Sequence, residues 1–328
     1  MTIKSSGNPL AFSEIETEFG ANGTRSLGSY RLTQSVGTLS NLPLDTGIPS
    51  SGQIKFSDFY GKQLNIVVDC HSGSREDRIT AKNDKWNNNN LTVIGGFRSK
   101  KEGGSKIYIN VNKKFCSDKF NVNNCALKTG SWDSTATVQV DLGSNAKVFG
   151  AGGDGGAGSQ GVNNNGSPGG TGTSGLGIDT NNVTVNVASG AIIRAGFGGG
   201  GGGGGGSQQD KNADRRASGG GGGGGAGCPA GNGGPGGNVG AGGGAGSAGT
   251  ETTGGGGGGG GNNANQAYGA SGGSGANLGG NAGAGGSSQS GGGAAGGNGA
   301  AIRRSSGFNV TINNSGTITG CTTATGVG

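Results

Sequence analysis

The chain has 328 residues, a formal net charge of +6 and a pI near 9.1. Its basic residues occur singly or in pairs such as Lys100-Lys101 and Arg215-Arg216, with no dense basic stretch among aromatic residues. This pattern argues against nucleic acid as a partner and is compatible with an anionic polysaccharide surface. The start, MTIKSSGNPL, lacks the apolar segment of a signal peptide, and no run reaches the ~18 apolar residues of a membrane span, so we expect synthesis in a cytoplasm and no membrane insertion.

Glycine is distributed unevenly and divides the chain. Only 15 of the 86 glycines precede residue 150, and the large apolar side chains lie almost entirely before Phe149. We therefore expect a mainly β and irregular protein with three parts: a small module over 1–62, a small β domain over 63–149, and a glycine-rich region over 150–328.

The first sixty residues contain a short echo, SGNPLAFSEI at Ser6–Ile15 and SGQIKFSDF at Ser51–Phe59. In the first copy, Ser13 and Glu16 have the spacing of a capping box, which predicts a short helix over Glu14–Phe19. In the second copy, Ser57 and Asp58 predict a single turn. The pattern predicts either a compact docking module or merely two helix caps. The predicted docking residues are all apolar or aromatic: Phe12, Ile15, Phe19, Tyr30, Phe56, Phe59 and Tyr60.

Strand patterns follow, since β-branched and aromatic residues alternate in four segments. These segments are Leu64–Cys70, Leu91–Phe97, Lys106–Val111 and Thr135–Leu142. Asn87–Asn90 and Gly103-Gly104 supply turns between them. The sequence therefore predicts a small antiparallel β domain.

The five cysteines form an odd set without CxxC spacing, and His71 is the single histidine. A structural zinc site needs about four clustered ligands, so no metal is expected. The cysteines are either free core residues, or Cys116 and Cys125 form a disulfide that closes a short loop.

The glycine-rich region alternates glycine runs with polar inserts. The runs are Gly198–Gly206, Gly219–Gly225 and Gly254–Gly261. Three β-like phrases, beginning at Thr137, Val183 and Val310, each lead into glycine or small residues, which suggests that strands enter the glycine blocks and that the chain returns to a β layer.

A flexible linker is the default interpretation of such runs, and collagen is excluded because glycine is not at every third position. The similar run lengths, roughly 25 Å at about 3.1 Å per residue, favour a bundle of polyglycine-II helices edged by short strands. Ordering costs roughly 1–2 kcal/mol per residue and a hydrogen bond returns about 0.5–1.5 kcal/mol, so close contacts between main chains must supply the rest. Rods in the middle should therefore be almost pure glycine.

Two stretches carry a resemblance to known proteins. FSEIETEFG with SLGSYR and IPSSGQIKFSDFYGK, at Phe12–Gly20, Ser26–Arg31 and Ile48–Lys62, resemble short N-terminal modules of virion structural proteins of tailed phages. The glycine-rich half resembles the receptor-binding adhesins at the tips of the long tail fibres of T-even-like phages. That resemblance implies a polyglycine-II sandwich whose distal loops recognise host-surface molecules.

No catalytic constellation is evident. His71 lies beside Asp69 and Cys70 without a paired nucleophile and base, the glycine runs lack the Lys-Ser/Thr ending of a phosphate loop, and the acids Asp210 and Asp214 sit in a polar insert. We expect a non-enzymatic protein without a cofactor.

The best binding candidates are insert residues that combine amides with an aromatic ring or arginine, although they could serve solubility alone. They are Gln208, Gln209, Asp210, Arg215, Arg216, Asn262, Asn265, Gln266 and Tyr268.

We expect a tail protein assembled in the host cytoplasm that binds other tail, fibre or baseplate proteins and a host-surface polysaccharide or outer-membrane protein; a homo-oligomer stays open. The alternatives are a purely architectural collar, baseplate or decoration protein, and a secreted ice-binding or matrix protein.

Overall fold

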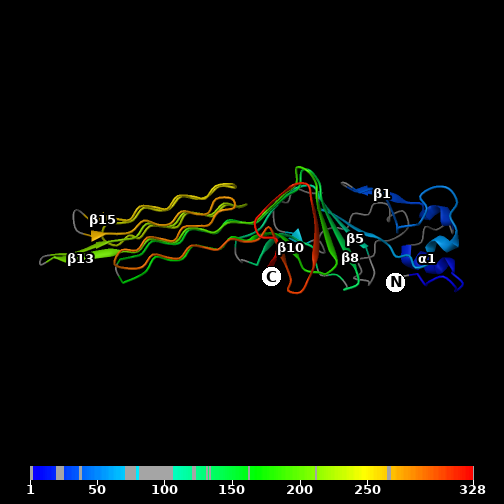
Figure 1. Ribbon diagram of the computed structural model, residues 1–328, viewed down its shortest axis with the longest axis horizontal. Coiled ribbons are helices and arrows are strands. Elements are labelled where there is room, and N and C mark those ends of the chain that lie inside the picture. The colour runs from blue at the N-terminus through cyan, green and yellow to red at the C-terminus, as the bar shows by residue number, and fades with distance from the viewer. Residues whose placement is uncertain are drawn as a thin grey trace.

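The computed structural model shows an elongated molecule with three regions in a row (Figure 1). The structure describes residues 3–19, 26–36, 39–70, 79–80, 106–119, 123–130, 132, 134–161, 163–210, 213–263 and 267–327. An N-terminal module lies at one end, strands form the middle, and glycine-rich rods extend to the other end. Several segments named above lie outside the described residues: the predicted strand at Leu91–Phe97, the predicted turns at Asn87–Asn90 and Gly103-Gly104, and His71.

The N-terminal module packs around an aromatic core. Its elements are α1 (Phe12–Phe19), η1 (Leu27–Tyr30), β1 (Thr33–Val36), β2 (Leu39–Pro43) and η2 (Phe56–Phe59). Phe19, Tyr30 and Phe59 are fully buried, and their rings contact one another at centroid distances of 5.7–6.1 Å. Burial is the main cause that raises the pKa of Tyr30 to about 12, and the nearby negative charge of Glu16 adds to the shift.

The echoed segments Ser6–Ile15 and Ser51–Phe59 also have similar local structures. The Ala11 N–H donates to Glu14 Oε2 at 2.8 Å, and the Lys55 N–H donates to Asp58 Oδ2 at 2.7 Å, so each copy caps its own turn with the acid of its Phe-Ser-acid phrase. The predicted cap from Glu16 is wrong because the helix begins at Phe12 and places Glu14 in the capping position. The predicted second turn is confirmed as η2.

The middle region is a parallel β-solenoid, which corrects the predicted antiparallel domain. The chain passes three parallel sheets in turn. Among the described residues, the first coil adds a strand to the first and third sheets, and each of the next four coils adds one strand to every sheet. The first sheet contains β3 (Ile66–Asp69), β5 (Lys106–Val111), β8 (Thr137–Leu142), β11 (Val183–Val187) and β18 (Val310–Asn314). The second contains β6 (Lys114–Cys116), β9 (Lys147–Phe149), β12 (Ile192–Arg194) and β19 (Thr317–Thr319). The third contains β4 (Ile79–Thr80), β7 (Cys125–Lys128), β10 (Ser174–Ile178), β17 (Ile302–Arg304) and β20 (Ala324–Thr325).

The three repeated phrases of the sequence are successive coils of this solenoid. Val138, Val183 and Val310 pair in register, as do Val140, Val185 and Ile312. Alternate side chains point inward, so β11 buries its three valines and leaves Thr184 and Asn186 half-buried. The sheets take strands from both sides of residue 150, so the compositional change near Phe149 is not a boundary between folded layers.

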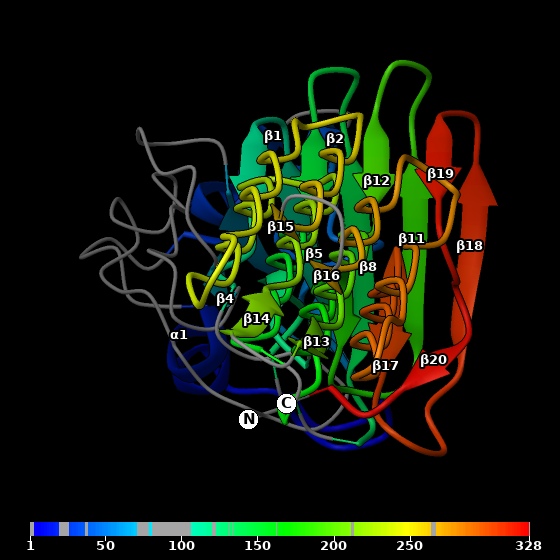
Figure 2. The ribbon, with the colours of Figure 1, turned by 90° about the vertical axis from the view of Figure 1, so that its left-hand side faces the viewer.

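The glycine-rich rods are two excursions from one corner of the solenoid. Residues 150–173 leave after β9 and return to β10, and residues 195–301 leave after β12 and return to β17. Viewed end-on, the rods are coiled ribbons that lie side by side (Figure 2). Residues with positive φ, such as Gly161 and Gly240, occur where one rod turns into the next.

The interior rods bond to their neighbours with a three-residue repeat. Within residues 218–226, three successive N–H groups point to three different rods, and three successive carbonyls accept from three others. The N–H groups of Gly220, Gly221 and Gly222 donate to Ala270, Gly244 and Gly156, and their carbonyls accept from Gly203, Gly258 and Gly234, all at 2.7–3.0 Å. Residues 196–204 also have six neighbouring rods. The backbone groups of both rods are thereby paired with other backbone groups, except that the Gly198 N–H donates to the side-chain oxygen of Asn298 at 3.0 Å.

Steric contact explains why these interior rods are glycine. The glycines of the runs lie outside the left-handed region, so their torsions alone would accept alanine. A Cβ on Gly222 would, however, lie 2.0 Å from the Gly200 carbonyl oxygen, and a Cβ on Gly203 would lie 2.0 Å from that of Ala270. In the edge run, Gly256 and Gly259 face open space. The prediction that middle rods are almost pure glycine therefore holds for two of the three runs, and the third lies at the edge.

A junction ties the base of the rods to the solenoid. Cys116 at the end of β6 forms a disulfide with Cys228, across a sequence separation of 112, and Glu251 pairs with Lys114 at 2.6 Å and with Arg194 at 3.9 Å. Burial lowers the pKa of the Arg194 guanidinium, and Glu251 opposes that shift.

The predicted Cys116–Cys125 disulfide is wrong. Cys125 is the first residue of β7 in the third sheet, where it forms no disulfide and is buried beneath the backbone of Gly177, whereas Cys116 bonds to Cys228 in the turn between two rods. Closeness in sequence was a poor guide because the two cysteines belong to different sheets.

Candidate functional site

The end of the bundle farthest from the N-terminal module carries two hairpins (Figure 1). They are β13 (Gly206–Asp210) with β14 (Ala213–Ala217), and β15 (Asn262–Asn263) with β16 (Ala267–Tyr268). Both are antiparallel and lie against each other. We call this end, with the turns at 159–165, 238–240 and 287–290, the tip.

The smaller turns hold the hairpins in place. Gln289 Oε1 accepts hydrogen bonds from the Ser207 N–H at 2.6 Å and the Ser207 hydroxyl at 3.1 Å. The Ser288 hydroxyl donates to the Tyr268 carbonyl at 2.7 Å. One short turn therefore contacts both hairpins, so the tip is one connected surface.

The predicted binding residues come together at the tip. Those on described backbone are Gln208, Gln209 and Asp210 on β13, Arg215 and Arg216 on β14, Asn262 on β15 and Tyr268 on β16. Asn265 and Gln266 lie outside the described residues. Tyr268 is 56% exposed and is one of two large hydrophobic side chains exposed in the described part of the chain. An exposed tyrosine on an ordered strand offers an apolar ring and a hydroxyl to a ligand at a low entropic cost.

Sequence reasoning missed the turns that complete the tip. Asn165 Oδ1 accepts from the Gly291 N–H at 2.8 Å, and Gln160 Oε1 accepts from the Asn238 N–H at 3.1 Å. The feature of the sequence that could have revealed these turns is that polar residues interrupt glycine-rich stretches there. The inserts at Cys228 and Thr250–Thr253 lie at the solenoid end instead, where Cys228 and Glu251 make the junction.

The predicted docking residues lie at the opposite end of the molecule, and most of them form the core of the module. Ile15, Phe19, Tyr30 and Phe59 are 0% exposed, so they stabilise the module and cannot touch a partner directly. Tyr60 is half-buried and donates a hydrogen bond from its hydroxyl to the Asn8 carbonyl at 2.6 Å.

The exposed part of this set is an aromatic pair. Phe56 is 41% exposed, and its ring meets that of half-buried Phe12 edge-on at 6.0 Å. The two rings occupy equivalent positions in the echoed phrases and form an aromatic pair at the surface of the described part of the module.

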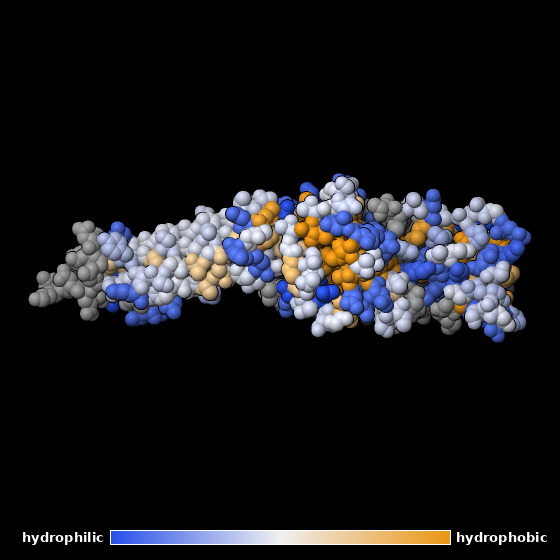
Figure 3. Space-filling model, viewed as in Figure 1, coloured by the Kyte–Doolittle hydropathy of each residue, from blue (hydrophilic) through white to orange (hydrophobic). Residues whose placement is uncertain are grey.

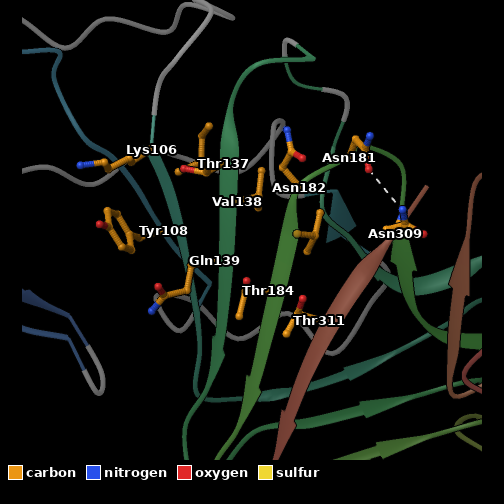
Figure 4. Close-up of a pocket in the computed structure, with 12 residues that line it drawn as sticks. Lys106, Tyr108, Thr137, Val138, Gln139, Asn181, Asn182, Thr184, Asn309 and Thr311 are labelled. Atoms are coloured by element: carbon orange, nitrogen blue, oxygen red, sulfur yellow. Dashed lines mark hydrogen bonds between the residues drawn. The ribbon is translucent and has the colours of Figure 1, made fainter. Parts of the chain in front are cut away.

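A groove lies on the outer face of the first sheet, near the amino ends of β5, β8 and β11 (Figure 4). Tyr108, Gln139, Thr184 and Thr311 form one row across the strands. Lys106 at its edge pairs with Asp45 of the N-terminal module at 3.3 Å. Lys106 and Tyr108 are the titratable residues of the lining, so it offers hydroxyl and amide groups without a matched acid and base.

The described residues contain no group of three or more His, Cys, Asp or Glu residues that could hold a metal ion. Within the same residues, no helix has the length and apolarity needed to cross a membrane.

The architecture defines a class of protein: a β-solenoid that projects side-chain-poor rods and collects polar and aromatic residues at their far end. The model of the family described as phage tail fibre adhesin Gp38 matches residues 75–323, and the chain belongs to this family. It is therefore a tail component of a tailed phage with an adhesin role. Searches of curated proteins and of solved structures found no match.

Proposed function

We propose that the chain attaches to the tail fibre through its N-terminal module and binds a host-surface receptor through its tip, without enzymatic activity. One observation carries this proposal: the two ends of the elongated molecule differ in chemistry, with the Phe12–Phe56 pair at one end and Tyr268 with the polar hairpins at the other. The rods between them offer almost no side chains, so selective recognition along the bundle has to come from its loops.

The rods are polyglycine-II helices in this proposal. The three-residue repeat of hydrogen bonds in 218–226 and 196–204 supports it, because a helix with three residues per turn points successive amides in three directions. The negative φ of the run glycines agrees with a left-handed extended helix. Such a bundle would hold the tip at a fixed distance and orientation, which lowers the entropic cost of binding.

Phage particles carrying variants of this chain test the proposal. Tyr268→Ala at the tip should reduce the adsorption rate about 10-fold or more, the loss expected for a central aromatic contact worth roughly 1.4 kcal/mol. Thr252→Ala is the matched control, because Thr252 is an exposed residue in a turn at the opposite end of the rods. It should leave adsorption unchanged. Competition with purified host polysaccharide or outer-membrane protein then identifies the class of receptor.

The same particles test the attachment half. Phe56→Ser should reduce incorporation of the chain into virions, measured by immunoblot, while the purified variant keeps its binding to host cells. Normal adsorption by the Tyr268→Ala particles and by particles lacking residues 207–216 would contradict a receptor-binding tip and favour an architectural spacer. Normal incorporation of Phe56→Ser would move the attachment surface away from the aromatic pair.

A further inference from the structure

Away from the tip, the solenoid carries the side chains that a ligand could contact. In Figure 3 the rods are mostly pale, while strongly hydrophilic and strongly hydrophobic residues gather on the solenoid and the N-terminal module. The groove on the outer face of the first sheet has a volume of about 430 Å³, within the range of roughly 300–1,000 Å³ that is usual for ligand sites. It is large enough to hold a small ligand or one segment of a longer one.

A row of hydrogen-bonding side chains crosses the floor of this groove. Four neighbouring strands contribute one residue each, in register: Tyr108, Gln139, Thr184 and Thr311. Figure 4 shows these side chains on the face of the sheet. Adjacent strands lie about 4.8 Å apart, so the polar groups recur at a regular spacing. A ligand with repeating polar groups would therefore meet one protein partner on each strand.

A buried carboxylate in the next row fixes the orientation of Gln139. Asp141 is 3% exposed, and its two oxygens accept hydrogen bonds from Gln139 Nε2 at 3.1 and 2.9 Å. Asn186 Nδ2 donates to Asp141 Oδ1 at 2.7 Å, and Asn313 Nδ2 donates to Asn186 Oδ1 at 2.8 Å. Because its amide nitrogen is engaged, Gln139 offers its amide oxygen to a ligand as a fixed acceptor. Such preorganisation lowers the entropic cost of binding.

Tyr108 adds an apolar surface and a donor to the row. Burial raises the pKa of its hydroxyl, Lys106 opposes the shift, and the carboxylates of Asp45 and Asp141 add to it. The hydroxyl therefore stays protonated at neutral pH and can donate a hydrogen bond. The half-buried ring beside it presents a flat apolar face.

The chemistry of the groove disfavours an anion and an extended peptide. The cation of the described lining, Lys106, is engaged with Asp45 Oδ1 at 3.3 Å and with Thr46 Oγ1 at 2.9 Å, so it is a poor anion site. An extended peptide would need backbone groups at a sheet edge, whereas those of the groove floor pair in the ladders between neighbouring strands. A neutral glycan needs neither feature, because its hydroxyls both donate and accept hydrogen bonds and its ring faces can lie on an aromatic side chain.

We propose that this groove binds a neutral segment of a host-surface polysaccharide, whose successive sugar rings lie across the strands. Tyr108 stacks on one ring, and Gln139, Thr184 and Thr311 bond to hydroxyls along the segment. The groove lies at the opposite end of the rods from the tip (Figure 1). Long surface glycans that reach this end would hold the particle near the cell while the tip meets its own receptor.

Titration calorimetry of the purified full chain tests the proposal. The probes are polysaccharides of a susceptible host, prepared separately from its lipopolysaccharide and from its capsule. We expect at least one of them to bind, and the one that binds identifies the source of the glycan. Because the recognised segment is neutral, the affinity should change little between low and high salt.

Substitutions in the row locate the binding. Tyr108→Ala should weaken it about 10-fold or more, and Tyr108→Phe, which removes one hydroxyl, about 3- to 10-fold. Thr311→Arg places a long side chain in the groove from an exposed position and should abolish binding without unfolding the chain. Thr317→Arg is the matched control, because Thr317 is an exposed threonine on β19 in the second sheet. It should bind as the unaltered chain does, and thermal unfolding checks that each variant is folded.

Four results would overturn the proposal. They are failure of both polysaccharides to bind, loss of affinity at high salt, equal binding by Thr311→Arg and Thr317→Arg, and a Thr311→Arg chain that still binds glycan but no longer enters virions. The last would make the groove a docking surface for a fibre protein. Tyr268→Ala should leave this binding unchanged, so failure of the groove and failure of the tip are told apart; glycan binding lost only in Tyr268→Ala would place the glycan at the tip and also overturn the proposal.

Discussion

The solenoid and the glycine bundle reach close packing by opposite means. The solenoid fills its interior with side chains, as in β11, where Val183, Val185 and Val187 are at most 2% exposed. The bundle removes side chains, so that main chains approach until amides and carbonyls of different rods meet at 2.7–3.1 Å. Hydrophobic burial orders the first region, and paired backbone groups with close dispersion contacts order the second.

The difference predicts opposite tolerance to changes in volume. An apolar core can lose a methylene group and relax partly around the gap. A carbonyl held 2.0 Å from a new Cβ has no comparable freedom, because its rod is hydrogen-bonded to its neighbours. Adding one carbon to the bundle should therefore cost more than removing one from the solenoid.

The largest effect is expected for Gly222→Ala. The new Cβ would force apart two interior rods and break their hydrogen bonds, costing on the order of 3 kcal/mol or more. Gly259→Ala, at an exposed position of the edge run with nothing within 4 Å of its Cβ, is the matched control and should be close to neutral. Thermal unfolding followed by calorimetry measures both. Equal stability of the two variants would break the comparison.

An intermediate effect is expected for the joint substitution Cys116→Ser and Cys228→Ser. This removes the disulfide cross-link between the solenoid and the base of the bundle and should lower the free energy of unfolding by about 2–4 kcal/mol. Hydrogen exchange should show faster opening at the base of the rods than in the solenoid strands. Cys321→Ser, at a free and exposed cysteine, should change neither quantity. Uniform exchange across both regions would show that they unfold as one unit.

The smallest effect is expected for Ile193→Val in the solenoid core. Ile193 is 0% exposed, and removal of one methylene should cost about 0.5–1.5 kcal/mol by denaturant unfolding. Ile192→Val, on the half-buried neighbour in β12, should cost less. If Ile193→Val proved as damaging as Gly222→Ala, the two regions would not differ in tolerance.

Much of the fold could be predicted from local patterns. The strands at Lys106–Val111 and Val183–Val187, the early helix and the return of the chain to a β layer all follow from alternation, capping and repetition. Strand direction could not be predicted, because nothing local in Leu64–Cys70 or Thr135–Leu142 distinguishes a hairpin partner from the next coil of a solenoid. The spacing of the valine phrases, interrupted by whole glycine excursions, hid the solenoid repeat.

The candidate site was accessible to sequence reasoning only in part. The two larger inserts stand out by length, and their described residues share the tip. Asn165 and Gln289 did not stand out, because their roles depend on which turns lie at the same end of the bundle. The partner of Cys116 was hidden for a related reason, since Cys228 is distant in sequence and reaches it only through the rod connections.

The two excursions depart from adjacent strands and return to adjacent strands, since β9 pairs with β12 and β10 pairs with β17. A pulling force on the tip is therefore delivered to both sides of one solenoid corner and divided among several lengths of chain. Because neighbouring rods are bonded along their whole length, sliding one past another loads many weak bonds at the same time. A phage particle attached to a moving cell surface would then be held by a mechanically stiff bundle whose rods share the load.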